Sequence, residues 1–216
     1  MMNKKLVCFD MDGVIFRKRN FWLELHKIYG TFDEGVRLTE KYLYSDYDKL
    51  VEEVVVKLWC NMPENKYLEL VESYEYLEGV QEIFSFLKEN NCLSAIISAS
   101  SIDVARRVQR DFGVDFLFAN SLIFEDGKVS GKFDWPVGAG SGAKARIIRD
   151  LRKKLNINSA DLIYVGDSKN DVEAFKEASI SIAFNCSYNP LKELASHIVD
   201  SDNLNDILPI LKKKLA

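Results

Sequence analysis

The sequence predicts an α/β fold whose Rossmann-like, doubly wound and mostly parallel sheet carries an inserted helical segment and a small β-hairpin. Short apolar runs recur along the chain, and stretches with helical periodicity separate several of them, which predicts the sheet. Residues 16–77 contain helix-like stretches without a clear buried strand, which predicts the insertion. The 216 residues therefore divide into an α/β core of residues 1–15 and 78–216 and a helical cap of residues 16–77.

Five apolar runs are the expected strands, and the helical stretches lie between them. The runs are LVCF (6–9), LSAIIS (93–98), DFLFA (115–119), LIYVG (162–166) and ISIAF (180–184). The helical stretches of the core are VQEIFSFLKEN (80–90), IDVARRVQRDF (102–112), AKARIIRDLRKKL (143–155) and NDVEAFKEA (170–178). Strands that alternate with helices favour a parallel sheet covered on both faces, with ligands at the carboxyl ends of the strands.

Two further segments complete the expected fold. SLIFEDGKVSGKF (121–133) contains two strand-like pieces around Asp126 and Gly127, a pair typical of a hairpin turn. The insertion contains three helix-like stretches, NFWLELHKIYG (20–30), YDKLVEEVVVKLW (47–59) and PENKYLELVESY (63–74).

Composition excludes several classes of function. The net charge is −4 and no basic stripe is present, so a nucleic-acid partner is not expected. The longest apolar stretches are too short to span a bilayer, and the apolar run at the amino terminus is too short for a signal peptide. The four cysteines form no CxxC pair. A soluble cytoplasmic protein, a monomer or a homodimer without a membrane partner, is therefore expected.

Acidic side chains follow two of the expected strands. Asp10 and Asp12 come directly after LVCF, and Asp167 and Asp171 follow LIYVG. If the strands are parallel, these four carboxylates meet at one edge of the sheet, where each like-charged pair at 4 Å repels by about 4 kcal/mol at an effective dielectric of 20. A divalent cation offsets this repulsion, and oxygen-only ligands suit Mg²⁺.

The other polar groups at this edge suit a phosphate. Ser98 ends the second run and can donate a hydrogen bond, and Lys144 brings a positive charge at the start of a helix. Ser100 and Asp103 resemble a capping box that opens the helix of residues 102–112, whose first amides favour an anion.

Two aspartates, Asp10 and Asp12, suit the chemistry of phosphoryl transfer. Asp10 can attack phosphorus as a carboxylate nucleophile and form an aspartyl-phosphate. Asp12 can protonate the leaving oxygen and later deprotonate water, an acid–base contribution of roughly 10²–10⁴-fold.

These motifs resemble those of the haloacid dehalogenase superfamily of phosphohydrolases. The resemblance lies in FDMDG, in Ser98 after AII, in Lys144 and in GDSKND. FANSLIFEDGKVSG and GDSKNDVEAFKEASISIAFN are similar to the phosphoserine phosphatase branch, in which a helical cap of the C1 type follows the first motif.

The resemblance implies a role for each matching residue. Asp10 is expected to be the nucleophile and a Mg²⁺ ligand, and Asp12 the acid–base, with its carbonyl oxygen on the metal. Asp167 is expected to bind Mg²⁺, and Asp171 to support the metal site. The residues expected to hold the phosphoryl oxygens are Ser98, Ala99 and Lys144.

The insertion departs from the phosphoserine phosphatase pattern. That branch places a glutamate shortly after the first motif, where this chain has Arg19, and an arginine in the cap, where YDKLVEEVVVK offers none. In this placement the charges that a phosphoserine head group needs are missing, so phosphoserine stays an open alternative rather than the expected substrate. Arg19 is expected to meet an anionic or polar part of the substrate. Most aromatic residues of the insertion are expected to pack its own core, and Phe16 is the best candidate among them to line the substrate pocket, because it directly follows the catalytic loop.

The sequence thus predicts a Mg²⁺-dependent phosphatase that hydrolyses a small phosphorylated metabolite through an aspartyl-phosphate. A phosphotransferase or mutase of the same superfamily remains an alternative. A receiver-like phospho-acceptor domain is a second, although its aspartate cluster would not be followed by about sixty helical residues. A non-catalytic binding protein with this fold is a third.

Overall fold

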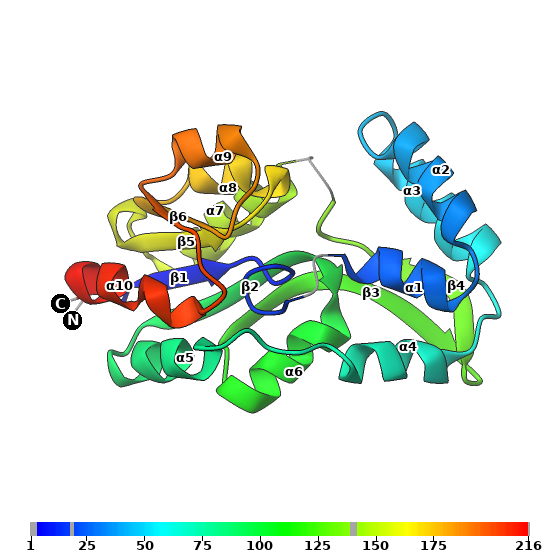
Figure 1. The fold of residues 1–216 in the computed structure, drawn as a ribbon, viewed down its shortest axis with the longest axis horizontal. Helices are drawn as coiled ribbons and strands as arrows, with labels where there is room; N and C mark the ends of the chain where they lie inside the picture. Colours follow the sequence, from blue (N-terminus) through cyan, green and yellow to red (C-terminus); the bar gives the residue numbers. More distant parts are fainter. Residues whose placement is uncertain (1–3, 18–19, 139–141, 216) are drawn as a thin grey trace.

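A computed structural model of the chain describes residues 4–17, 20–138 and 142–215. Within these ranges the strands form one seven-stranded sheet in the order β4-β3-β2-β1-β5-β6-β7 (Figure 1). Its strands are β1 (Leu6–Phe9), β2 (Leu93–Ser101), β3 (Phe116–Glu125), β4 (Lys128–Asp134), β5 (Leu162–Gly166), β6 (Ile180–Phe184) and β7 (His197–Val199). All neighbouring strands run parallel except β3 and β4, which are antiparallel. The predicted α/β class is confirmed.

Helices cover both faces of the sheet, with α5, α6 and α10 on one side and α7, α8 and α9 on the other (Figure 1). The helices of the core are α5 (Val80–Glu89), α6 (Ile102–Phe112), α7 (Ala143–Leu155), α8 (Val172–Phe175), α9 (Asn189–Leu194) and α10 (Leu208–Leu215). Single 3₁₀ turns lie at Ser159–Asp161, Lys169–Asp171 and Leu204–Ile207.

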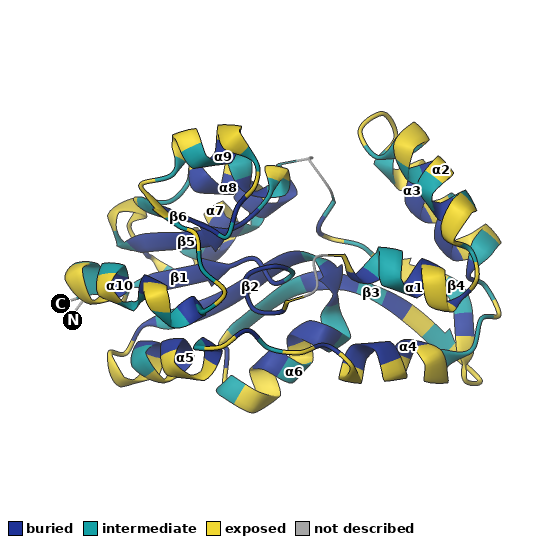
Figure 2. Cartoon of the chain, viewed as in Figure 1, coloured by how far each residue is buried: buried dark blue, intermediate teal, exposed yellow. Residues whose placement is uncertain are grey.

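Strand β1 separates the two layers of the core. Leu6 and Cys8 pack into the apolar cluster that contains Ile148 of α7, whereas Phe9 faces the other cluster and lies 5.3 Å from Phe84 of α5 between ring centroids. This alternation is the period of two that a strand imposes on its side chains. Figure 2 shows the strands of the sheet largely buried beneath helices whose outer faces are exposed.

The structure corrects three details of the sequence prediction. Helix α6 is capped by Ser101, whose hydroxyl accepts a hydrogen bond from the Asp103 amide at 3.1 Å, so the expected capping box at Ser100 is wrong. Strand β2 continues through Ser100, so the residue that caps the start of α6 is the next one along the chain. Strand β7 and helix α2 were not expected, β7 because two of its three residues are exposed.

The β3–β4 hairpin has the turn that its sequence predicts. Glu125 pairs with Lys128, and the two residues between them have positive φ angles, 51° at Asp126 and 71° at Gly127. Positive φ at both central positions defines the turn whose twist matches that of the strands, and Asp-Gly is a preferred pair for it.

The insertion between β1 and α5 consists of α1 (Phe21–Ile28), α2 (Phe32–Tyr42), α3 (Tyr47–Glu52), a π-helical turn (Glu53–Leu58) and α4 (Glu64–Glu72). Its two chain ends lie side by side, since the Leu77 amide donates to the Ile15 carbonyl at 2.9 Å. Its middle is attached to the hairpin, where the Val129 amide donates to Met62 at 2.9 Å and the Val129 carbonyl accepts from Asn61 at 2.8 Å.

No helix among residues 4–17, 20–138 and 142–215 has the length and apolar character needed to cross a membrane.

Candidate active site

The first acidic group lies where β1 ends. The Asp10 amide still donates to the Val165 carbonyl of β5 at 2.9 Å, so the backbone remains in the sheet while the side chain points past its edge. One carboxylate oxygen of Asp10 accepts the Met11 amide at 2.7 Å. Gly13, with a φ angle of 82°, then allows the chain to turn away from the sheet.

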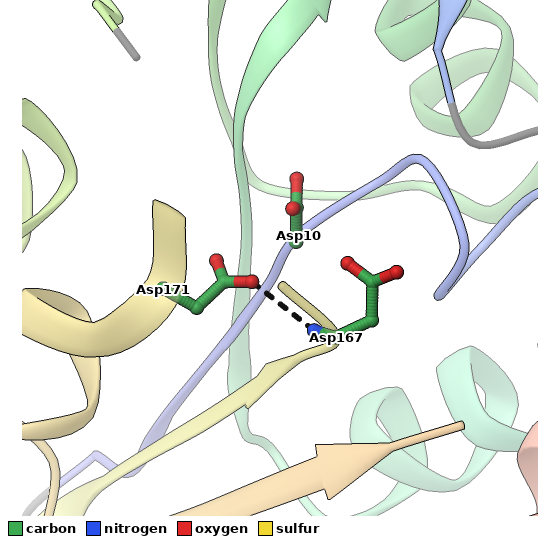
Figure 3. A group of neighbouring side chains, drawn as sticks. All are labelled: Asp10, Asp167 and Asp171. Carbon is green, nitrogen blue, oxygen red and sulfur yellow. Dashed lines mark hydrogen bonds between the residues drawn. The ribbon is translucent and has the colours of Figure 1, made fainter. Parts of the chain in front are cut away.

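Three carboxylates gather at this edge. Asp10, Asp167 and Asp171 are buried, and each offers an oxygen within 4.8 Å of the others (Figure 3). They meet because β1 and β5 are adjacent parallel strands, so the residues that follow them emerge at the same edge. The spacing and the oxygen-only chemistry of this group fit a hard divalent cation.

Lys144 lies between two of these carboxylates. Its buried ammonium is 2.8 Å from Oδ2 of Asp10 and 2.7 Å from Oδ1 of Asp171. Burial alone would lower the pKa of Lys144, but the two carboxylates raise it above its usual value, so the side chain stays charged. Burial raises the pKa of Asp10, while Lys144 acts in the opposite direction. One lysine among three buried carboxylates leaves an excess of negative charge that a metal ion would neutralise.

Asp171 is held by a dense set of hydrogen bonds. Oδ1 accepts from Lys144 and from the Tyr164 hydroxyl at 2.8 Å, and Oδ2 accepts the amides of Asp167 at 3.1 Å and Ser168 at 3.0 Å and, at 3.3 Å, the Ser168 hydroxyl. A Cβ atom at Gly166 would lie 2.5 Å from Cγ of Asp171, so only glycine fits there. Sequence reasoning missed Tyr164, because a tyrosine inside an apolar run is indistinguishable from an ordinary core residue.

Asp12 lies outside the group formed by Asp10, Asp167 and Asp171 and has different partners. Its Oδ2 accepts the amide of Phe21, the first residue of α1, at 3.2 Å. Burial of the carboxyl and the negative charge of Asp10 raise the pKa of Asp12 to about 7. A carboxyl with this pKa can both give and take a proton near neutral pH.

The residues at the end of β2 lie in the same cavity as the carboxylates. Ser98 is buried, and its hydroxyl oxygen accepts the Ser100 amide at 3.3 Å. The Ala99 carbonyl accepts the indole N–H of Trp22 at 2.7 Å and an amide N–H of Asn120 at 2.9 Å. The last residues of β2 are therefore fixed from two sides where they border the cavity.

The cavity has a volume of about 590 Å³ and two distinct ends. The catalytic end is lined by Asp10, Asp12, Ser98, Lys144 and Asp167. The helical end is lined by Trp22, Leu50, Val51, Val54, Trp59 and Trp135.

The expectation that Phe16 lines the cavity is wrong. Phe16 is fully buried and packs against Tyr74 and Tyr76, with ring centroids 5.6 and 4.7 Å away. Trp135 of the segment after β4 lines the cavity instead, a residue that sequence reasoning did not single out. Arg19 lies outside the described residues, so its contact with substrate stays a prediction.

The chain is similar to known hydrolases in both sequence and structure. Residues 4–179 match the family model of haloacid dehalogenase-like hydrolases. Phosphoserine phosphatase of Methanocaldococcus jannaschii is 28% identical over 211 residues, which cover 97% of this chain and 98% of that relative. Phosphoserine phosphatase of Saccharomyces cerevisiae is 30% identical over 212 residues, covering 96% of this chain and 67% of that protein.

Solved structures give the same result. A phospho-aspartyl intermediate analogue of phosphoserine phosphatase superposes with a TM-score of 0.83 at 28% identity, covering 96% of this chain and 99% of the other. A substrate-bound phosphoserine phosphatase superposes with a TM-score of 0.83 at 27% identity, covering 97% and 99%. The resemblance to the phosphoserine phosphatase branch is confirmed, and the chain belongs to the haloacid dehalogenase-like hydrolase family.

Proposed function

We propose that this protein is a Mg²⁺-dependent phosphatase that hydrolyses a small phosphorylated metabolite through an aspartyl-phosphate on Asp10. As a hydrolase of this family with phosphoserine phosphatases as relatives along its length, it is a phosphoric monoester hydrolase. The observation that carries the proposal is the convergence of Asp10, Lys144 and Asp167 in one cavity, beside Asp12 with its raised pKa.

In the first half of the reaction, a carboxylate oxygen of Asp10 attacks phosphorus, and the bond between phosphorus and the leaving alcohol oxygen breaks. Asp12 gives its proton to that oxygen, which a carboxyl of pKa about 7 can do at neutral pH. In the second half, Asp12 takes a proton from water, the water oxygen attacks phosphorus, and the bond to Asp10 breaks. Inorganic phosphate leaves and both aspartates return to their starting states.

Ser98 and Lys144 hold the phosphoryl oxygens in this scheme, and Ala99 borders them. Both polar groups are buried, so their hydrogen bonds to a phosphate act where water competes little. The ammonium of Lys144 already lies 2.8 Å from Asp10, so a phosphoryl group bound to Asp10 would remain within its reach.

The metal site draws on the same carboxylates. Asp10 and Asp167 would hold Mg²⁺ through their side chains and Asp12 through its carbonyl, while Asp171 supports the site by holding Lys144 and the loop after β5. When bound, the ion supplies positive charge that neutralises the carboxylates and orients the phosphate. Residues 16–77 would act as the cap that excludes bulk water during the transfer.

The test is hydrolysis of p-nitrophenyl phosphate by the purified protein with Mg²⁺. Asp10→Asn removes the nucleophilic charge and is expected to lower kcat by about 10³-fold or more. EDTA is expected to abolish activity, and added Mg²⁺ to restore it. Asp126→Asn, at the tip of the hairpin, is the matched control and should retain full activity. Activity that survives in Asp10→Asn, or that chelators do not change, would falsify the proposal.

A further inference from the structure

The helical end of the cavity presents carbon surface. All three of its tryptophans donate their indole N–H inside the protein: Trp22 to the Ala99 carbonyl at 2.7 Å, Trp59 to the Thr31 hydroxyl at 3.2 Å, and Trp135 to the Tyr47 hydroxyl at 2.9 Å. Since these donors are occupied, the indoles offer a bound molecule only their rings.

The three indoles form a continuous aromatic wall. The ring centroids of Trp22 and Trp135 are 4.5 Å apart with planes at 33°, and those of Trp22 and Trp59 are 5.9 Å apart. Leu50, Val51 and Val54 are buried beside this wall. A flat apolar group that enters from the catalytic end would meet these side chains.

Formal charge is confined to the rim of this part of the cavity. Outside the catalytic end, the charged side chains among the described lining residues are Glu40 and Lys169, and both are exposed. Lys169 lies over the ring of Tyr44, 4.0 Å from its centroid. His26 is buried, and burial lowers its pKa to about 4, so it is neutral at physiological pH.

The consequence for a substrate follows from desolvation. A carboxylate or an ammonium in the buried part of the helical end would lose its water and gain no opposite charge from the described residues there. An uncharged ring would instead gain free energy by leaving water. The described residues of the helical end therefore favour an uncharged ring over the head group of phosphoserine.

We propose that the substrate is a phosphate monoester of an alcohol that carries an uncharged, flat apolar ring, and that this ring packs against the half-buried Trp22 and Trp135, behind which Trp59 is fully buried. This inference rests on the proposed phosphatase function and names the substrate class of the same site.

The test compares two substrates that differ in one group. In O-phosphoethanolamine and 2-phenylethyl phosphate the phosphate is joined through the same two-carbon chain to an ammonium and to a phenyl group respectively. With Mg²⁺ present, kcat/KM for 2-phenylethyl phosphate is expected to be about 10- to 100-fold higher, the factor that transfer of a phenyl group from water gives. Phosphoserine is expected to be as poor a substrate as O-phosphoethanolamine.

Variants locate the preference. Trp135→Ala is expected to lower the ratio of the two kcat/KM values about tenfold. Phe32→Ala, which removes an aromatic ring exposed on α2 outside the cavity, is the matched control and should leave the ratio unchanged. Val54→Arg adds a cation to the helical end and is expected to shift the preference towards phosphoserine. Thermal unfolding of each variant shows whether it is folded.

The outcomes separate the inference from the function on which it rests. A preference for phosphoserine or O-phosphoethanolamine, or a ratio unaffected by Trp135→Ala, overturns the substrate class but leaves the phosphatase intact. If no ester is hydrolysed, p-nitrophenyl phosphate included, the proposed function fails and the inference fails with it.

Discussion

The two ends of the cavity are built in opposite ways. The catalytic end consists of polar side chains from the ends of strands and from the start of α7, held by short polar contacts such as the 2.8 Å pair of Lys144 with Asp10. The helical end consists mainly of apolar and aromatic side chains from the insertion and from the segment after β4, held by packing and by the indole hydrogen bonds of its three tryptophans. On the two proposals above, chemistry belongs to the polar end and selectivity to the apolar end, and each can be altered while the other is monitored.

Removal of Lys144, the buried cation of the catalytic end, is expected to have the largest effect. Lys144→Met leaves Asp10 and Asp171 without their partner, and breaking a buried ion pair in this way costs about 3–5 kcal/mol. Activity should fall by about 10³-fold because the phosphate loses its positive contact. Steady-state kinetics and urea unfolding measure the two losses. Lys66→Met, on the exposed face of α4, is the control, and a Lys144→Met protein of normal stability would contradict this account.

Loss of one hydroxyl at the catalytic end should have a smaller effect. Tyr164→Phe deletes the 2.8 Å hydrogen bond to Asp171, and a hydrogen bond to a charged group contributes about 1.5–3 kcal/mol. We expect kcat to fall by about tenfold with little change in KM, because Tyr164 acts through Asp171 and does not touch the substrate. Equal kcat values for the variant and the wild type would show that Asp171 does not need this support.

A change in the insertion should alter stability more than chemistry. A Cβ atom at Gly35 of α2 would lie 2.5 Å from the His26 ring, so Gly35→Ala forces the two helices apart at a cost of about 1–3 kcal/mol. His26→Ala in the same chain removes the ring and should relieve the clash, a coupling that a double-mutant cycle measures by thermal unfolding. Asp33→Ala, exposed on the same helix, serves as the reference. Additive losses in the double variant would mean that the helices do not meet as described.

The smallest effect is expected from the ionisation of His26, which changes stability only below about pH 6.5. Its pKa is about 4 in the folded protein against 6.5 in the unfolded chain, so the unfolded chain binds more protons between these values. The stabilisation is complete above about pH 6.5 and is lost as the pH falls towards 4. The unfolding free energy of the wild type should therefore drop more steeply over this range than that of His26→Leu. Parallel curves for the two proteins would refute the assignment.

The catalytic end could be predicted from sequence because it follows a local rule. Polar residues that directly follow apolar runs must emerge at the carboxyl edge of a parallel sheet, and Asp10 and Asp167 obey this rule whatever the rest of the chain does. The hairpin was predictable for the same reason, since two residues, Asp126 and Gly127, specify its turn.

The helical end could not be predicted because it depends on contacts between distant segments. Trp22 and Trp135 are far apart in the chain and meet only after the hairpin has packed against the insertion. Proximity in sequence to the catalytic loop suggested Phe16, but the bridge that pairs it with Tyr76 turns the ring into the core. Tyr164 was missed because its apolar run looks like an ordinary buried strand, and its hydrogen bond to Asp171 forms only when the 3₁₀ turn after β5 folds back over the strand.

The hydrogen bonds between Val129 and the segment of Asn61 and Met62 limit how the insertion can move. An insertion held only at its two chain ends, near Ile15 and Leu77, would be free to rotate about those ends. In this structure the insertion is also hydrogen-bonded to the hairpin through Asn61 and Met62. Rotation of the insertion must therefore either bend the hairpin of β3 and β4 or break these two main-chain hydrogen bonds, which contribute roughly 0.5–1.5 kcal/mol each.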